Sequence, residues 1–133
     1  MVDSGRNKIT ILVVDDEECL LNLIRIILEQ EGYSLLCARS AEEALQIMQS
    51  QEQSIDLLLT DMRMPSMTGG VLAGEFKTVY PASEVIYMTA YSPEDTTLRL
   101  PGQAVLFKPF SPVLLCEMVE KSLDRLSQHN IDV

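Results

Sequence analysis

Three aspartates, a threonine and a lysine stand where short apolar segments of the sequence end. Asp15 and Asp16 follow the segment 9–14, Asp61 follows 55–60, Thr89 ends 85–89, and Lys108 follows 104–107. Clustered carboxylates raise one another's pKa unless a cation lies among them, and a small hard ion prefers oxygen ligands. If the fold brings the three aspartates together, we expect them to bind Mg²⁺, which commonly takes a few carboxylates together with phosphate oxygens.

One of these carboxylates could also act as a nucleophile. An aspartate attacks a phosphoryl donor to form an aspartyl phosphate when a metal ion and cationic side chains stabilise the charge on the phosphoryl oxygens. Lys108 offers an ammonium group and Thr89 a hydroxyl. The combination predicts a site that receives a phosphoryl group. A single acidic residue after a strand is more often part of a helix start, which is the interpretation we adopt for Glu17 and Glu18.

Strand and helix patterns alternate along the whole chain. Segments that are apolar almost throughout, as in strands covered on both faces, lie at 9–14, 34–38, 55–60, 85–89 and 104–107. Helical patterns lie at 17–31, 40–50, 69–79, 93–100 and from 111 onward. This order predicts an α/β fold with a doubly wound parallel sheet. The carboxyl ends of its strands share one edge, where the five functional residues are expected to meet.

The helices carry recognisable start signals, stop signals and inward faces. Ser40 with Glu43 is a capping box, Ser111 is an N-cap, and Gly32 is a stop signal. The residues expected to face the core are Leu20, Leu23, Ile24, Ile27 and Leu28 in the first helix, and Leu115, Val119, Leu123 and Leu126 in the last.

Composition limits the possible functions. The 133 residues indicate a single domain with a core from about 8 to 126 and polar ends. Twenty acidic against ten basic residues give a net charge of −10, which disfavours direct binding to nucleic acid or to an anionic membrane. We see no signal peptide or membrane span, and we expect the three cysteines to be buried free thiols. Both observations favour a cytoplasmic location.

The segments VVDDEE, LLLTDMRMPSMTGG, VIYMTAYS and VLFKPF resemble the receiver domain of two-component response regulators. The resemblance covers about Lys8 to Leu126. It implies a flavodoxin-like (CheY-like) five-stranded sheet of order 2-1-3-4-5 with helices on both faces. It also implies a bacterial phosphorelay in which Asp61 accepts a phosphoryl group from a histidine kinase or a histidine phosphotransfer protein. The output partner is not specified.

The same resemblance implies roles for individual residues. Mg²⁺ would be held by the carboxylates of Asp15, Asp16 and Asp61 and by the backbone carbonyl of Arg63. Lys108 and Thr89 would contact the phosphoryl group, and the Lys108–Pro109 peptide would be cis. The loop after Asp61 would carry Pro65 and Gly69. Arg63 and Tyr91 are candidates for tuning the rate of dephosphorylation. The alternative, which we weigh equally, is that both are ordinary residues at the rim of the site.

The sequence departs from the family pattern in two places. Val105 stands where the family carries an aromatic switch residue, so we expect an output through loop and backbone motion. The interval from Thr89 to Lys108 is short, which shortens the helix expected at 93–100, the fourth of the fold. This shortening is similar to receivers of hybrid histidine kinases, and it leaves a stand-alone regulator and a fragment of a longer protein both open.

Two further features concern partners. Cys19 and Ile26 widen the apolar stripe of the first helix, which in the family faces the phosphodonor; extra core contact is the alternative. His129 lies in the polar sequence SQHNIDV and is expected to be solvated rather than a phosphoryl donor.

Other functions fit the sequence less well. An Mg²⁺-dependent phosphohydrolase with an aspartyl nucleophile would want a second aspartate where Arg63 stands, so we do not expect turnover of external phosphate esters. A nucleotide-binding module would want G-x-G-x-x-G after the first strand, where DDEE stands. A receiver that binds partners without phosphorylation is disfavoured because the acidic residues, Thr89 and Lys108 are all present.

Overall fold

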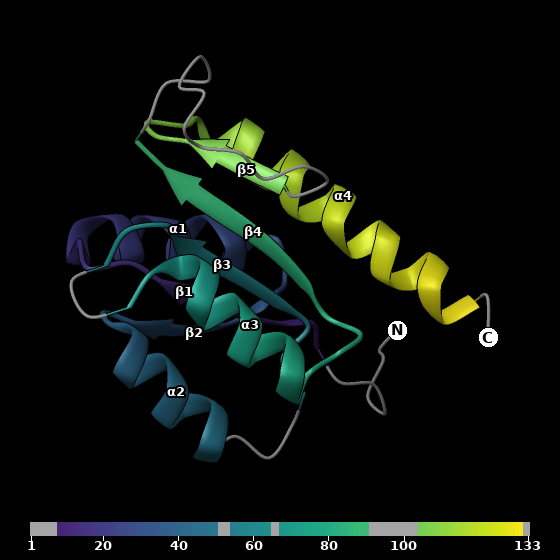
Figure 1. The fold of residues 1–133 in the computed structure, drawn as a ribbon. Coiled ribbons are helices and arrows are strands. Elements are labelled where there is room, and N and C mark those ends of the chain that lie inside the picture. Colours follow the sequence, from purple (N-terminus) through teal and green to yellow (C-terminus); the bar gives the residue numbers. More distant parts are fainter. Residues whose placement is uncertain (1–7, 51–53, 65–66, 91–103, 132–133) are drawn as a thin grey trace.

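The apolar segments form five parallel strands between two layers of helices in the computed structural model (Figure 1). The structure describes residues 8–50, 54–64, 67–90 and 104–131, with side chains of the last helix described as far as Arg125. The strands are β1 (Thr10–Val14), β2 (Ser34–Ala38), β3 (Leu57–Asp61), β4 (Glu84–Thr89) and β5 (Ala104–Phe107). The helices are α1 (Glu18–Gln30), α2 (Ala41–Ser50), α3 (Gly69–Val79) and α4 (Pro112–Ile131).

The strand order is β2-β1-β3-β4-β5, and every neighbouring pair is parallel. This confirms the predicted order 2-1-3-4-5. The predicted strands agree with the observed ones to within two residues at each end, and 34–38 and 104–107 agree fully. The largest difference is at β3, which begins at Leu57, two residues after the predicted start; just before it, Asp56 donates its N–H to the Thr10 carbonyl of β1 at 2.9 Å.

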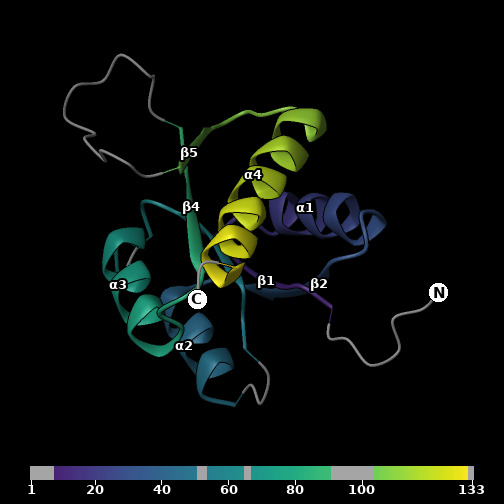
Figure 2. The ribbon, with the colours of Figure 1, turned by 90° about the vertical axis from the view of Figure 1, so that its right-hand side faces the viewer.

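The sheet separates two hydrophobic cores. Successive side chains of a strand point to opposite faces, so in β1 Leu12 and Val14 belong to one core and Ile11 and Val13 to the other. The first core is closed by α2 and α3, the second by α1 and α4. Figure 2 shows these two helix pairs on opposite sides of the sheet. The interior strands are therefore covered on both faces, which explains their nearly continuous apolar sequences.

The start and stop signals of the helices act as predicted, with one variation. Ser40 Oγ accepts the Glu43 N–H at 3.1 Å, whereas the Glu43 carboxylate reaches one residue further back, to the Arg39 N–H at 2.7 Å. Ser111 Oγ accepts the Leu114 N–H at 3.0 Å. After α1 the chain turns at Gly32, whose φ of 96° is readily adopted by glycine.

The predicted inward face of α1 is partly wrong. Leu23 is 51% exposed, whereas Leu21, which the pattern omitted, is only 4% exposed. Ile24 and Leu28 are buried as predicted, and Leu20 and Ile27 are half-buried. In α4, Leu115 and Val119 are buried and Leu123 is half-buried, while the side chain of Leu126 lies outside the described residues.

The cysteines also differ from the prediction of buried thiols. All three are free, but Cys19 is exposed and Cys37 and Cys116 are half-buried. The helix predicted at 93–100 and the side chain of His129 lie outside the described residues. In the part of the chain that is described, no helix is long and apolar enough to cross a membrane.

Candidate functional site

Strand register brings the predicted functional residues to one edge of the sheet. Val14 is in register with Thr60, so the residues that follow them, Asp15 and Asp61, lie side by side. On the other side of β3, Asp61 is in register with Met88, the residue before Thr89. The ladder continues past the strand ends, because the Asp15 N–H donates to the Ala38 carbonyl at 3.1 Å. The site is therefore built directly on the sheet.

Three carboxylates form the acidic part of this site. One oxygen from each of Asp15, Asp16 and Asp61 lies within 4.8 Å of the others. Asp15 is fully buried, Asp61 is 9% exposed, and Asp16 is exposed to solvent. A cluster of this size, open on one side, suits a hard cation that keeps some of its water, so the residues fit a magnesium ion.

Lys108 joins two of these carboxylates. Its Nζ lies 2.7 Å from Asp15 Oδ2 and 3.4 Å from Asp61 Oδ2. The Lys108 N–H donates to the Thr89 carbonyl at 2.7 Å, which fixes the lysine beside the end of β4. The Lys108–Pro109 peptide is cis, the isomer that the resemblance implies. The sequence did not predict that Asp15 would be the nearer ion-pair partner of Lys108.

The charge balance of the site is unfavourable for Asp61. Burial raises the pKa of the Asp61 carboxyl, and the neighbouring Asp15 raises it further; Lys108 and the Arg63 N–H offset only part of this rise. Burial alone would lower the pKa of Lys108, but its contacts with Asp15 and Asp61 outweigh burial and raise it. Lys108 is thus held as a cation, while Asp61 would benefit from a second positive charge.

The space in front of Asp61 is a small pocket of about 270 Å³. Its lining comprises Asp61, Arg63, Thr89, Ala90 and Lys108. Thr89 is only 2% exposed, whereas Arg63 is exposed at the rim. The Arg63 N–H donates to Asp61 Oδ1 at 3.3 Å, which orients the carboxylate. The pocket thus combines a carboxylate, an ammonium group and a hydroxyl around a space open to solvent.

Gly69 brings the start of α3 against the backbone of Asp61. Its N–H donates to the Met62 carbonyl at 2.9 Å. A Cβ atom at this position would lie 2.3 Å from the Asp61 carbonyl oxygen, so only glycine fits without movement. Gly69 was expected in the loop after Asp61, but its requirement for glycine has no sequence signal, because it depends on a contact across the loop.

The remaining predicted residues lie around this site or outside the description. Val105 is half-buried on β5, in register with Tyr87, and packs against the core under α2 and α3. Tyr91 and Pro65 lie outside the described residues. Cys19 and Ile26 are both exposed on α1, so the alternative that they extend the core is wrong.

Comparison with known proteins identifies the family. A family model described as the response regulator receiver domain matches residues 11–120. The chain belongs to this family. Receiver domains are phosphate-accepting signalling domains of two-component systems, and this chain has their fold and a matching cluster of aspartates.

Curated relatives include both regulators and kinases. The transcriptional regulatory protein ZraR of Escherichia coli is 36% identical over 95% of this chain, which corresponds to 28% of ZraR. The sensor kinase CckA of Brucella abortus is 32% identical over 87% of this chain and 13% of the kinase. The chain therefore spans less than a third of the length of each of these two relatives.

Solved structures agree with the family assignment. A CheY-like receiver domain from Methanospirillum hungatei has a TM-score of 0.80 at 30% identity, covering 92% of this chain and 99% of the other. The response regulator TrrA of Thermotoga maritima, solved in complex with Mg²⁺ and BeF, has a TM-score of 0.72 at 34% identity, covering 85% of this chain and 97% of TrrA.

Proposed function

We propose that this receiver accepts a phosphoryl group on Asp61 from a phosphohistidine of a histidine kinase or a histidine phosphotransfer protein. An Asp61 oxygen forms a bond to phosphorus while the bond between phosphorus and one ring nitrogen of the donor imidazole breaks. The second ring nitrogen of the donor carries a proton, so the imidazole leaves as the neutral base. The observation that carries this proposal is the position of Asp61 in a solvent-open pocket that Lys108 and Thr89 also line. Both groups suit the charge of a phosphoryl group.

The acidic cluster supports a requirement for magnesium. Asp15, Asp16 and Asp61 would hold the ion together with the Arg63 carbonyl, and the bound ion would neutralise charge on the phosphoryl oxygens. The raised pKa of Asp61 is the physical reason for expecting a cation, because a positive charge would relieve the repulsion between Asp15 and Asp61. Lys108 alone does not relieve this repulsion, because the pKa of Asp61 stays raised beside it.

The other groups of the pocket have distinct tasks in this proposal. Lys108 stabilises negative charge on the transferred group, and the Thr89 hydroxyl donates a hydrogen bond to one of its oxygens. The Arg63 N–H keeps the Asp61 carboxylate in one orientation. Because Arg63 replaces the second aspartate of aspartyl-nucleophile phosphohydrolases, the domain acts on its own phosphoryl group and does not turn over external esters.

An exposed apolar stripe on α1 is suited to contact the phosphodonor. Cys19, Leu23 and Ile26 follow one another at four- and three-residue spacing, which places them on one face of the helix. Leu23 is 51% and Ile26 is 56% exposed. The helix begins two residues after Asp16, so this stripe starts beside the acidic cluster. A donor helix that packs on it would bring its histidine towards Asp61.

The signal leaves the site without an aromatic switch on β5. Val105 occupies that position, and its half-buried side chain has no ring to rotate. Output therefore depends on movement of the loops and backbone near Thr89 and Lys108, whose N–H and carbonyl groups are bonded to each other. The short interval between these residues favours a receiver similar to those of hybrid histidine kinases.

Phosphotransfer from a labelled donor tests the proposed role of Asp61. Phosphorylated histidine kinase or phosphotransfer protein is mixed with the receiver, and transfer of the label is followed over time. Wild type is expected to gain the label, and Asp61→Asn to gain none. Equal labelling of the two proteins would show that another residue is the acceptor.

A further inference from the structure

The last two residues of β3 place a buried hydroxyl next to the proposed acceptor. The strand reads LLLTD, so Thr60 follows three leucines and directly precedes Asp61. Its exposed fraction is 0%, and β3 is an interior strand covered by helices on both faces. Valine has nearly the same shape and would fill this position without a polar atom. A buried hydroxyl costs free energy unless it forms a hydrogen bond, so the partner of Thr60 is informative.

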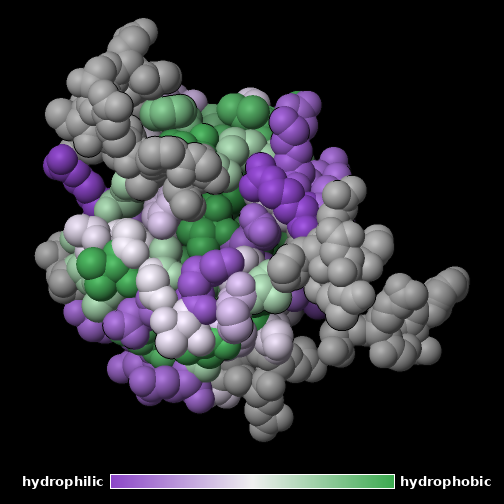
Figure 3. All heavy atoms as spheres, turned by 45° about the vertical axis from the view of Figure 1, so that its right-hand side comes forward, coloured by the Kyte–Doolittle hydropathy of each residue, from purple (hydrophilic) through white to green (hydrophobic). Residues whose placement is uncertain are grey.

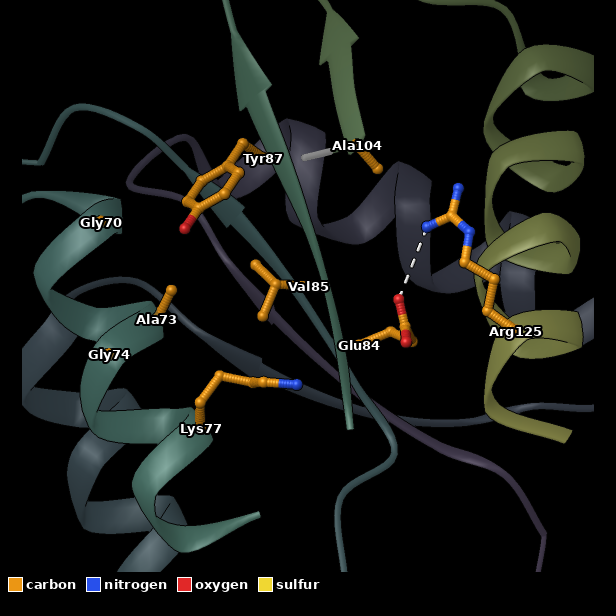
Figure 4. A pocket seen from close by; sticks show the side chains of 9 residues that line it. All are labelled: Gly70, Ala73, Gly74, Lys77, Glu84, Val85, Tyr87, Ala104 and Arg125. Carbon is orange, nitrogen blue, oxygen red and sulfur yellow. Dashed lines mark ion pairs between the residues drawn. The ribbon is translucent and has the colours of Figure 1, made fainter. Parts of the chain in front are cut away.

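Thr60 belongs to the face of the sheet that α2 and α3 cover. Side chains alternate along a strand, so Thr60 lies on the same side as Leu58, a member of the core closed by these helices. Its neighbour in register on β4 is Tyr87, which Figure 4 shows on the side of the strand that faces α3. Figure 3 shows this side of the molecule from outside, with hydrophobic side chains in the middle and hydrophilic ones around them. The Thr60 hydroxyl therefore lies beneath a largely apolar layer, out of reach of water.

The Thr60 hydroxyl donates to the backbone carbonyl of Asp61. Its Oγ1 lies 3.0 Å from the carbonyl oxygen, and the bond is buried. At the other end of the same peptide group, the Met62 N–H donates to the Met88 carbonyl of β4 at 2.9 Å. Both polar atoms of the peptide between Asp61 and Met62 are therefore held, the oxygen by Thr60 and the N–H by the neighbouring strand.

The orientation of this peptide affects the Asp61 carboxylate. The start of α3 at Gly69 leaves the carbonyl oxygen little room, and the bond from Thr60 fixes its direction. Beyond the peptide, the Arg63 N–H donates to Asp61 Oδ1 at 3.3 Å. That distance is slightly longer than usual for an N–H to oxygen bond, so a small rotation of the preceding peptide would break it. The carboxylate is thus oriented by a backbone that Thr60 holds in place.

We propose that Thr60 is a positioning residue for phosphoryl transfer to Asp61. Its hydroxyl fixes the peptide after Asp61, and this peptide keeps the Arg63 N–H on the Asp61 carboxylate. Thr60 does not line the acceptor pocket and acts only through the backbone of its neighbour. This role rests on the proposed function of Asp61 as the acceptor, because it concerns the accuracy with which the attacking carboxylate is aimed.

Two pairs of proteins separate the effect of the hydroxyl from the effect of packing. Thr60→Val differs from wild type by the hydroxyl at nearly constant volume, and Thr60→Ala differs from Thr60→Ser in the same way at a smaller volume. Thr10→Val is the matched control, because Thr10 is also buried but lies at the amino end of β1. Each protein is first checked for a cooperative thermal transition. The initial rate of phosphorylation by acetyl phosphate with Mg²⁺ is then followed by intact mass, at a temperature at which all are folded.

Rates are expected to follow the hydroxyl and not the volume. Thr60→Ser should react within about twofold of wild type, and Thr60→Val and Thr60→Ala should each react about tenfold or more slowly than the hydroxyl-bearing protein of their pair, because a small displacement of a reacting group lowers rates strongly. Thr10→Val should keep the wild-type rate.

Equal rates within either pair would overturn the role of Thr60, and either pair alone decides the question if a variant of the other does not fold. A loss in Thr10→Val as large as that in Thr60→Val would also overturn it, by making the effect general to buried threonines. These outcomes leave the acceptor role of Asp61 intact. Phosphorylation that persists in Asp61→Asn, or none in wild type, would instead overturn the proposed function and the role of Thr60 with it.

Discussion

Lys108 forms its shortest ion pair with Asp15, not with Asp61. The two Nζ–Oδ2 distances are 2.7 Å and 3.4 Å, and the Asp15 side chain is fully buried. Lys108 therefore balances a charge that water does not reach, in addition to facing the proposed acceptor. Lys108 is therefore expected to contribute both to the stability of the domain and to the chemistry of its site.

Removal of Lys108 is expected to destabilise the fold as well as impair phosphorylation. Lys108→Met leaves the Asp15 carboxylate buried without its counter-ion, and breaking such pairs typically lowers the free energy of unfolding by about 3 kcal/mol. Urea denaturation without magnesium measures the loss. Lys121→Met, at an exposed lysine of α4, is the control and is expected to change the free energy by less than about 0.5 kcal/mol. Equal stability of the two variants would contradict a structural role for the Lys108–Asp15 pair.

The raised pKa of Asp61 predicts a stabilising substitution. The folded protein holds this proton more tightly than the unfolded chain does, so without metal the group destabilises the fold as the pH rises through the carboxyl range towards neutrality. Asn carries no such charge. In EDTA at pH 7, Asp61→Asn is therefore expected to melt at a higher temperature than wild type, and the difference is expected to shrink as the pH is lowered.

Magnesium is expected to change the sign or the size of the difference in melting temperature between Asp61→Asn and wild type. The ion stabilises wild type by binding its folded state, and Asp61→Asn loses a carboxylate ligand. Thermal unfolding with and without MgCl₂ measures both effects. Glu75→Gln, at an exposed acidic residue of α3, is expected to shift neither curve. A lower melting temperature for Asp61→Asn in EDTA at pH 7 would contradict the described charge balance.

Gly69→Ala is expected to damage the site through the backbone. Its Cβ would lie 2.3 Å from the Asp61 carbonyl oxygen, so the loop or the end of β3 must move. A displacement near 1 Å lowers reaction rates on the order of 100-fold, and overpacking lowers stability by about 1–3 kcal/mol. The initial rate of phosphorylation by acetyl phosphate and urea denaturation measure the two effects. Gly70→Ala, the adjacent glycine with open space, should keep the rate, and similar rates for the two variants would refute this role of Gly69.

The exposed stripe of α1 is expected to affect transfer from a protein donor alone. Leu23→Glu and Ile26→Glu remove apolar contact area and add charge, so phosphotransfer from a histidine kinase should fall by about tenfold or more, which corresponds to about 1.4 kcal/mol. Phosphorylation by acetyl phosphate should not change. Val79→Glu on α3, where the native valine is 54% exposed, is the matched control. An equal loss in that control would assign the effect to charge in general.

The strands of this fold were predictable because the apolar segments of the sequence are the segments that the sheet buries. The segments 34–38 and 104–107 are apolar almost throughout and are followed by the basic residues Arg39 and Lys108, and their strands have the same bounds. The face of α1 was less predictable because this helix is apolar on several sides. Leu21 and Leu23 are chemically identical, and only the position of the helix on the sheet buries the first and exposes the second.

The sequence predicted which residues form the site, but not which of their side chains are in contact. Strand ends placed Asp15, Asp61 and Lys108 at one edge, because parallel strands share that edge. Which carboxylate lies nearest Lys108 depends on the register of four strands and on side-chain geometry, neither of which has a sequence signal. The burial of Ser122 in α4 also has no sequence signal. Its hydroxyl has no hydrogen-bond partner among the described residues.

The mass of the intact protein after incubation with acetyl phosphate tests the central claim most directly. Wild type and Asp61→Asn are each incubated with Mg²⁺ and with EDTA, and the spectra are recorded without acid or heat that would hydrolyse an acyl phosphate. We predict the gain of a single phosphoryl group by wild type with Mg²⁺ and no gain in the other three samples. A gain that persists in Asp61→Asn, or one that does not need the metal, would contradict the account of this site.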